Sequence, residues 1–153
     1  MKTLVIIPAY NEEKAIVETV KQLKEKAKDV DYVIIDDCSK DNTLKVCIEN
    51  NFNVIHLPIN LGIGGAVQTG YKYAKENNYD IAIQMDADGQ HDAKYIPELI
   101  AQVEAGNNLV IGSRFLEKQG FQSTFIRRIG ISLYSAIIKI FTKKIVKDTT
   151  SRI

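Results

Sequence analysis

The chain has 153 residues, and 45% of them are hydrophobic, which is enough to build one domain around a core of its own. Its formal net charge of +1 excludes the strongly basic surface of a nucleic-acid-binding domain and an acidic tail. Two cysteines without metal spacing, a strand-like first segment and no apolar run of ~18 residues predict a cytoplasmic protein with reduced thiols and neither signal peptide nor membrane span.

Short apolar runs alternate with segments of helical periodicity along the chain. Strands are predicted at residues 2–7, 32–35, 53–57, 80–85 and 109–111. Helices are predicted at residues 12–28, after the capping residues Ser39 and Asp41, and at 63–76 and 93–105. This alternation predicts one α/β domain over residues 1–153, with a mainly parallel, Rossmann-like sheet and helices on both faces.

Polar clusters follow the predicted strands. In open parallel sheets, ligands bind outside the carboxyl ends of the strands, where the chain leaves the sheet. The clusters occupy residues 8–12, 36–37, 60–65, 86–91 and 112–114. We therefore expect side chains that are far apart in the sequence to form one site at this edge.

The most informative cluster is Asp86-Ala87-Asp88-Gly89, which follows the fourth predicted strand. In an extended backbone, residues i and i+2 point the same way, so we expect the two carboxylates to converge. Their repulsion would be relieved by Mg²⁺ or Mn²⁺, which takes oxygen ligands and usually shares them with phosphate. The alternative is an Asp-Gly turn with a solvated acid pair.

Each of the other clusters allows a ligand role and a structural one. Asp36 or Asp37 suits hydrogen bonds to a ribose or a base, or else caps a helix. Tyr10 suits stacking on a base, or else is an interface aromatic. The glycine-rich segment 60–66 lets a backbone approach phosphate or sugar, or else packs a helix tightly on the sheet. Arg114 suits a diphosphate or is a surface arginine, and together the clusters indicate a nucleotide diphosphate held by a metal.

Taken together, these segments resemble the family 2 inverting glycosyltransferases with the GT-A fold. Within that family, the chain is similar to the branch that contains dolichyl-phosphate mannose synthase and bacterial polyprenyl-phosphate glycosyltransferases. The matching strings are P-A-Y-N-E at 8–12, D-D-C-S-K-D-N-T at 36–43, N-L-G-I-G-G-A at 60–66, Q-M-D-A-D-G-Q-H at 84–91 and G-S-R at 112–114. The resemblance covers essentially the whole chain, in the family's order and spacing.

The resemblance implies a nucleotide-sugar site and a metal site. Asp37 would contact the base, with Asp36 supporting it. Asp86 and Asp88 would be the catalytic pair, and together with Gln90 they would hold Mg²⁺ or Mn²⁺ against the diphosphate. The implied nucleotide-sugar-binding residues are Pro8, Tyr10, Glu12, Asp36, Asp37, Gly64, Asp86 and Arg114, with Arg127 or Arg128 as further phosphate contacts.

The implied activity is transfer of a sugar, with inversion, from a nucleotide diphosphate sugar to a polyprenyl or dolichyl phosphate or to a glycan, in cell-envelope or polysaccharide biosynthesis. A lipid phosphate is already anionic and needs no strong protein base, whereas a sugar hydroxyl requires a carboxylate base. The alternative is a non-catalytic nucleotide-sugar-binding module. A receiver-like phosphoacceptor domain is disfavoured, because it needs acids after the first strand and a lysine after the fifth. The sequence names neither the sugar nor the base.

Two segments near the end of the chain bear on the acceptor. Residues 148–153 begin the family's T-S-G-F-R-like motif without its Gly-Phe, so we expect the acceptor-side part to be missing and transfer by this chain to be weak. The segment 126–146 has a basic, amphipathic helical pattern, which suits peripheral contact with the inner face of a membrane. The alternative is packing on the domain, on a missing part or on a second subunit in a homo-oligomer.

Overall fold

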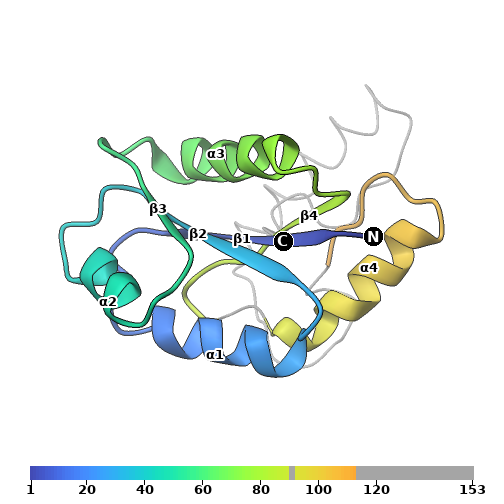
Figure 1. The fold of residues 1–153 in the computed structure, drawn as a ribbon, viewed down its shortest axis with the longest axis horizontal. Coiled ribbons are helices and arrows are strands. Elements are labelled where there is room, and N and C mark those ends of the chain that lie inside the picture. The colour runs from blue at the N-terminus through green and yellow to red at the C-terminus, as the bar shows by residue number, and fades with distance from the viewer. Residues whose placement is uncertain (90–91, 113–153) are drawn as a thin grey trace, which may run out of the picture. The chain divides into compact units, whose positions relative to one another are not determined.

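Four parallel strands form the central sheet of the computed structural model, which describes residues 1–89 and 92–112 (Figure 1). In the order in which they lie side by side, the strands are β3 (Val54–His56), β2 (Asp31–Asp36), β1 (Thr3–Ala9) and β4 (Ile81–Gln84). Every residue of β1 is buried, as expected for a central strand in a parallel sheet that is covered on both faces. The predicted α/β class with a parallel sheet is therefore confirmed.

The chain changes its direction across the sheet between β1 and β4. It adds β2 and then β3 on one side of β1, and it returns to place β4 on the other side. In doubly wound sheets, ligands bind beside such a switch in strand order, outside the carboxyl ends of the strands. The loops that follow β1 and β4 therefore flank the expected binding position.

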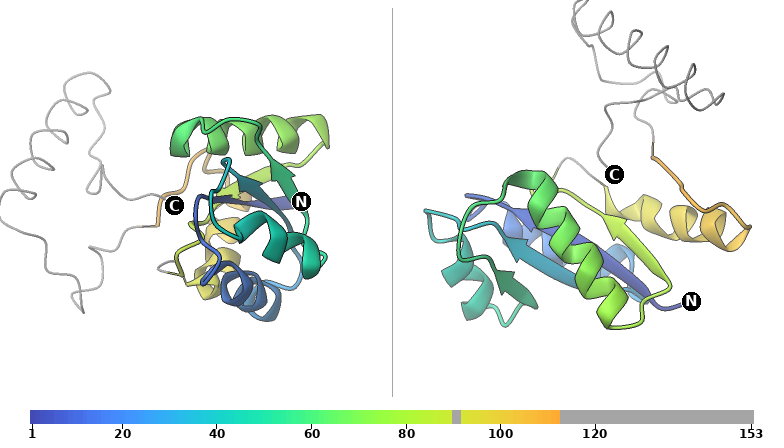
Figure 2. Two further views of the ribbon diagram at one scale, coloured as in Figure 1. Left: turned by 90° about the vertical axis from the view of Figure 1, so that its left-hand side faces the viewer. Right: turned by 90° about the horizontal axis from the view of Figure 1, so that it is seen from above.

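Helices cover both faces of the sheet, as predicted (Figures 1 and 2). One face carries α3 (Gly62–Glu76), and the other carries α1 (Ile16–Lys26), α2 (Thr43–Glu49), the short 3₁₀ helix η1 (Ala93–Tyr95) and α4 (Ile96–Glu104). Alternate residues of β1 serve the two layers. Leu4 and Ile6 belong to the core under α3, whereas Val5 and Ile7 belong to the core under α1 and α2.

A glycine allows α3 to pack closely on β1. A side chain at Gly70 would collide with Ile6, which is fully buried in the central strand. Glycine inside a helix ordinarily costs about 1 kcal/mol relative to alanine, and the close approach of helix and sheet explains its use here.

The structure differs from the predicted elements at two places. The fifth predicted strand, residues 109–111, is wrong: no strand forms there in the described part of the chain, and Leu109 is 78% exposed. A short apolar run becomes a strand only when its backbone pairs with a neighbouring edge. The first helix begins at Ile16 and not at residue 12, because residues 13–15 form a turn in which the Ala15 amide donates to the Glu12 carbonyl.

The described elements belong to one unit, residues 1–110. The prediction of a single domain over residues 1–153 extends past the described residues and stays a prediction.

Candidate functional site

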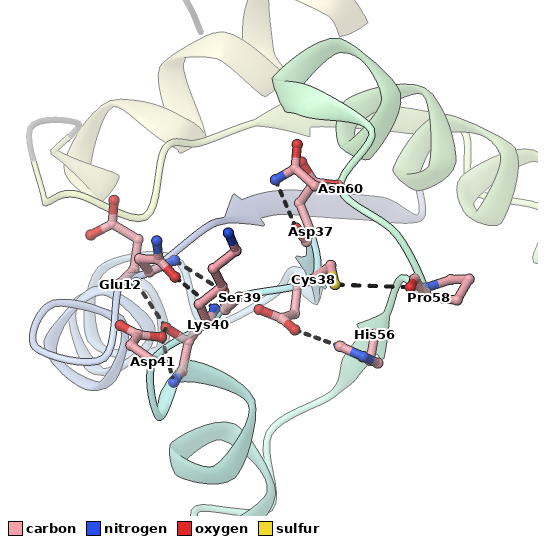
Figure 3. A network of polar contacts seen from close by, with 12 residues as sticks. Glu12, Asp37, Cys38, Ser39, Lys40, Asp41, His56, Pro58 and Asn60 are labelled. Atoms are coloured by element: carbon pink, nitrogen blue, oxygen red, sulfur yellow. Dashed lines mark hydrogen bonds and ion pairs between the residues drawn. The ribbon is translucent and has the colours of Figure 1, made fainter.

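The loops after β1 and β2 are joined by reciprocal hydrogen bonds (Figure 3). Asn11 Oδ1 accepts from the Lys40 amide at 2.8 Å, and the Asn11 amide donates to Ser39 Oγ at 3.0 Å. Asn11 and Cys38 have positive φ angles of 60° and 58°, so each loop turns sharply near this junction. These bonds hold the segments 8–12 and 36–43 in a fixed arrangement relative to each other.

A second group of bonds extends this junction to α2. The amides of Glu12 and Glu13 donate to Thr43 Oγ1 at 2.8 Å and to Asp41 Oδ2 at 3.2 Å. Asp41 Oδ1 also accepts from the Thr43 amide at 2.9 Å, so Asp41 bonds the first amide of α2, although the N-cap position itself is occupied by Asn42. Ser39, the other predicted cap, bonds to the loop after β1 instead.

Asp37 ties the glycine loop to the end of β2. Its Oδ1 accepts from the Leu61 amide at 2.7 Å, and its carbonyl oxygen accepts from Asn60 Nδ2 at 3.0 Å. The Asp37 carboxylate thus bonds to the segment before α3, its amide donates to the Ala9 carbonyl of β1 at 2.9 Å, and the start of α2 is bonded by Asp41 instead. A carboxylate can accept several hydrogen bonds, so the predicted contact of Asp37 with a base stays a prediction.

Asp36 is enclosed in the fold and pairs with a histidine that the sequence analysis did not select. Its Oδ2 lies 2.6 Å from Nδ1 of His56, which stands opposite Asp36 in the register of β2 and β3. Asp36 is fully buried, and its Oδ1 has no hydrogen-bond partner among the described residues. Asp36 therefore acts inside the fold, in keeping with a supporting role. The available signal for His56 was its position at the end of the neighbouring strand.

The acidic segment after β4 is a turn and not an extension of the strand. β4 ends at Gln84, and Ala87 and Asp88 already lie in the turn. The expected extended backbone through Asp88 is therefore wrong, and the convergence of the two carboxylates stays a prediction. Asp86 is half-buried and accepts from Gln84 Nε2 at 3.1 Å, whereas Asp88 is exposed. Gln90, the third predicted metal ligand, lies outside the described residues.

Glu12 links the loop after β1 electrostatically to this acidic turn. Burial raises the pKa of Glu12, and the negative charges of Asp88, Asp41 and Asp86 raise it further. Carboxylates from the loops after β1, β2 and β4 thus contribute to one negative region beside the switch in strand order. Crowding of this kind favours a bound cation.

The donor chemistry of this region fits a cation that is shared with a ligand. Within residues 1–89 and 92–112, no group of three or more His, Cys, Asp or Glu side chains is arranged to hold a metal ion. Asp86 and Asp88 offer carboxylate oxygens without forming a complete cage. Mg²⁺ and Mn²⁺ are commonly bound by one or two carboxylates together with phosphate oxygens and water, so the residues fit either ion.

The three glycines in the first turn of α3 differ in whether the fold requires glycine at their positions. Gly62 has a φ of +73°, which disfavours a side chain, and a side chain at Gly65 would strike Leu61. A Cβ at Gly64 would meet no atom within 4 Å. Packing against described residues therefore does not require glycine at position 64, and the predicted ligand role stays open there.

The remaining predicted residues lie at the same edge or outside the described residues. Pro8 is buried near the end of β1, where it stands opposite Ile35, and Tyr10 directly after the strand is 41% exposed. Tyr10 thus presents a ring at the carboxyl edge. The predicted phosphate contacts outside the described residues are Arg114, Arg127 and Arg128.

Solved structures establish the class of this fold. The chain is similar to S. aureus TarS 1-349 in complex with UDP, at a TM-score of 0.57 and 28% identity, over 69% of this chain and 32% of that chain. It is also similar to Mycobacterium tuberculosis glucosyl-3-phosphoglycerate synthase in complex with Mn²⁺, UDP and glucosyl-3-phosphoglycerate, at a TM-score of 0.55 and 22% identity, over 67% of this chain and 39% of that chain. The fold is that of the GT-A glycosyltransferases, as predicted.

The sequence places the chain within that class. The profile of glycosyl transferase family 2 matches residues 4–151, and the chain belongs to this family. An undecaprenyl-phosphate mannosyltransferase from Micrococcus luteus is 34% identical over 119 residues, which cover 74% of this chain and 49% of that protein. The chain spans about half the length of the curated relatives it matches.

Proposed function

We propose that this chain is the donor-binding part of a metal-dependent glycosyltransferase that moves a sugar, with inversion, from a nucleoside diphosphate sugar to a polyprenyl or dolichyl phosphate. The observation that carries the proposal is the placement of three motifs: the joined loops after β1 and β2 and the acidic turn after β4 all lie at the carboxyl edge, around the switch in strand order. Membership in family 2 supports it.

The nucleoside end is assigned to the joined loops. Tyr10 is exposed and suits stacking on a base, and the half-buried Glu12 has a carboxylate for ribose hydroxyls. Asp37 is buried and would contact a base N–H through carboxylate capacity that the Leu61 amide does not use. Because Asn11 already holds the two loops together, little ordering is required on binding, and such preorganisation raises affinity. UDP in the TarS complex supports a nucleoside diphosphate as the ligand.

The diphosphate end is assigned to the acidic turn. Asp86 and Asp88, with Gln90 as the predicted third ligand, would hold Mg²⁺ or Mn²⁺, which offsets the negative charge of the leaving diphosphate when bound. The chain contributes the shape of the turn: Ala87 is buried, and Gly89 has a φ of +74°, which lets the backbone turn after the second acid. Mn²⁺ and UDP occur together in the M. tuberculosis complex of the same fold.

A lipid phosphate is the acceptor that this site suits best. Its oxygen is anionic before it attacks the anomeric carbon from the side opposite the diphosphate, so no protein base is needed. The M. luteus relative is named for an undecaprenyl-phosphate substrate, in keeping with a role in the cell envelope. No helix in the described ranges has the length and apolar character to cross a bilayer. Membrane contact is assigned to the basic segment 126–146, which lies outside those ranges, at the inner face of the membrane.

Calorimetry with UDP and GDP, each in Mn²⁺ and in EDTA, tests the donor side on the chain as it is. We expect one of the two nucleotides to bind and to bind more tightly in Mn²⁺. Product formation from nucleotide sugars with polyprenyl phosphate, and with a glycan for comparison, tests the transfer. Binding without transfer would favour the non-catalytic nucleotide-sugar-binding module. Failure of both nucleotides to bind would contradict the proposed function.

A further inference from the structure

Helix α1 reaches the acidic turn through a threonine on its buried face. Thr19 Oγ1 donates to the carbonyl oxygen of Ala87 at 2.9 Å, across 68 residues of sequence. Both residues are nearly inaccessible, with exposed fractions of 5% for Thr19 and 3% for Ala87. Ala87 stands between Asp86 and Asp88, so this bond joins the helix to the middle of the acidic motif.

Thr19 is the one polar residue on the buried face of α1. Its neighbours on that face, Ile16, Val20 and Leu23, all belong to the core. Threonine is a weaker helix former than leucine or alanine, and a buried hydroxyl costs free energy unless it is hydrogen-bonded. Threonine in a helix often bonds to the carbonyl four residues earlier, but this one donates to a different segment.

The Thr19 bond lies just past the last described hydrogen bond between the sheet and the segment after β4. The Met85 amide still donates to the Ile6 carbonyl of β1 at 2.9 Å, and Ala87 lies two residues further along. The carbonyl group of Ala87 belongs to the planar peptide unit that leads into Asp88. Fixing that oxygen therefore fixes the plane from which the Asp88 side chain departs.

The same helix also contacts the segment where the turn rejoins η1. Lys26 Nζ lies 2.9 Å from Asp92 Oδ1, and both side chains are partly exposed. A partly exposed ion pair of this kind is screened by solvent, whereas both partners of the Thr19 bond are buried. Of these two contacts of α1, only the Thr19 bond reaches the acidic motif itself.

We propose that Thr19 is a positioning residue for the metal site: it orients the Ala87 peptide and with it the carboxylates of Asp86 and Asp88. This inference rests on the proposed function, in which those two acids hold the cation. Residues that orient metal ligands without touching the metal typically change metal affinity by about 10- to 100-fold when they are removed.

Thr19→Val tests the proposal, because it keeps the shape of the side chain and removes the donor, and Thr19→Ser keeps the donor. The readout is Mn²⁺ affinity, measured by calorimetry and by the EPR signal of free Mn²⁺. The measurement is made with the nucleotide, UDP or GDP, that binds the wild-type chain. We expect Thr19→Val to weaken Mn²⁺ binding about tenfold or more, to leave nucleotide affinity in EDTA unchanged, and Thr19→Ser to restore most of the loss. Thr69→Val is the matched control, because Thr69 donates to Gly65 within its own helix.

The arms separate the possible failures. If Asp88→Asn weakens Mn²⁺ binding but Thr19→Val does not, the positioning role is overturned and the metal site stands. The same holds if Thr19→Val lowers nucleotide affinity equally in Mn²⁺ and in EDTA. Unchanged Mn²⁺ affinity in Asp88→Asn would overturn the metal site and the role of Thr19 with it. If Thr19→Val does not fold, Thr19→Cys provides the same test, because a thiol is only a weak donor.

Discussion

Asp36 and Asp37 follow β2 much as Asp86 and Asp88 follow β4, and in the sequence the two pairs look alike. In the structure their surroundings are opposite. The pair after β2 is buried, with Asp36 against His56 and Asp37 bonded to the Leu61 amide. The pair after β4 is half-buried at its first member and exposed at its second.

The difference shows what an acid at a strand end can do. After β2, the carboxylates satisfy buried groups and hold loops together, so their loss would first be felt by the fold. After β4, Asp88 is exposed at the carboxyl edge of the sheet, where its side chain is within reach of a ligand in solution. Comparing variants of the two pairs, with stability and donor affinity measured side by side, therefore tests this distinction.

The largest effect is expected from Asp88→Asn. It removes a charged ligand, and we expect affinity for the nucleoside diphosphate in Mn²⁺ to fall on the order of a hundredfold. Because Asp88 is exposed, the free energy of unfolding should change by no more than about 0.5 kcal/mol. Calorimetry in Mn²⁺ and urea unfolding check both numbers, with the exposed Asp29→Asn as control. Equal affinity in wild type and Asp88→Asn would end the metal assignment.

Asp37→Ala should lower both quantities at once. It leaves the Leu61 amide without its acceptor, and we expect a loss of about 1–3 kcal/mol in unfolding free energy and a similar loss in donor binding. Asp37→Asn keeps an acceptor for that amide and should recover stability while donor affinity stays low. Urea unfolding and calorimetry separate the two. Full recovery of affinity by Asp37→Asn would mean that Asp37 serves only the loop.

His56→Ala should affect the fold and not the donor. It leaves the buried Asp36 without its hydrogen-bond partner, and we expect unfolding free energy to fall by about 1–2 kcal/mol. Combining it with Asp36→Asn should give less than the sum of the single effects, because the two residues are in contact. A urea unfolding cycle measures this coupling. Additive effects would show that the pair is not an interaction that stabilises the fold.

The smallest effect is expected from the pH dependence of Glu12. The pKa of Glu12 is raised in the folded chain, so the folded state holds the Glu12 proton more tightly than the unfolded state. The free energy of unfolding is therefore highest below the unfolded pKa and falls as pH rises through the folded pKa. Glu12→Gln should remove this loss, whereas Glu25→Gln on the exposed side of α1 should not. Mg²⁺ with nucleotide should lower the pKa of Glu12, because a nearby positive charge favours the carboxylate. A carboxyl titration by NMR that does not respond to Mg²⁺ would separate Glu12 from the cation.

The sequence by itself determined the α/β class, the alternation of strands and helices and the edge at which the polar clusters lie. These features follow from periods of two and 3.6 in the side-chain pattern, which are local properties of the chain. The polar clusters could be placed at one edge because parallel strands all end on the same side. The strand predicted at 109–111 is wrong because an apolar run is a local property and does not supply a neighbouring strand for its backbone to pair with.

Only the tertiary structure decided which acid has which surroundings. The strand order places β1 between β2 and β4, which brings Thr19 to Ala87 and Asn11 to Lys40. It also places β3 beside β2, which brings His56 to Asp36. Each of these bonds joins segments far apart in the sequence, and each depends on the direction of a side chain after packing. Two acid pairs with similar local sequence thus differ, because burial and hydrogen bonding depend on what the fold places around them.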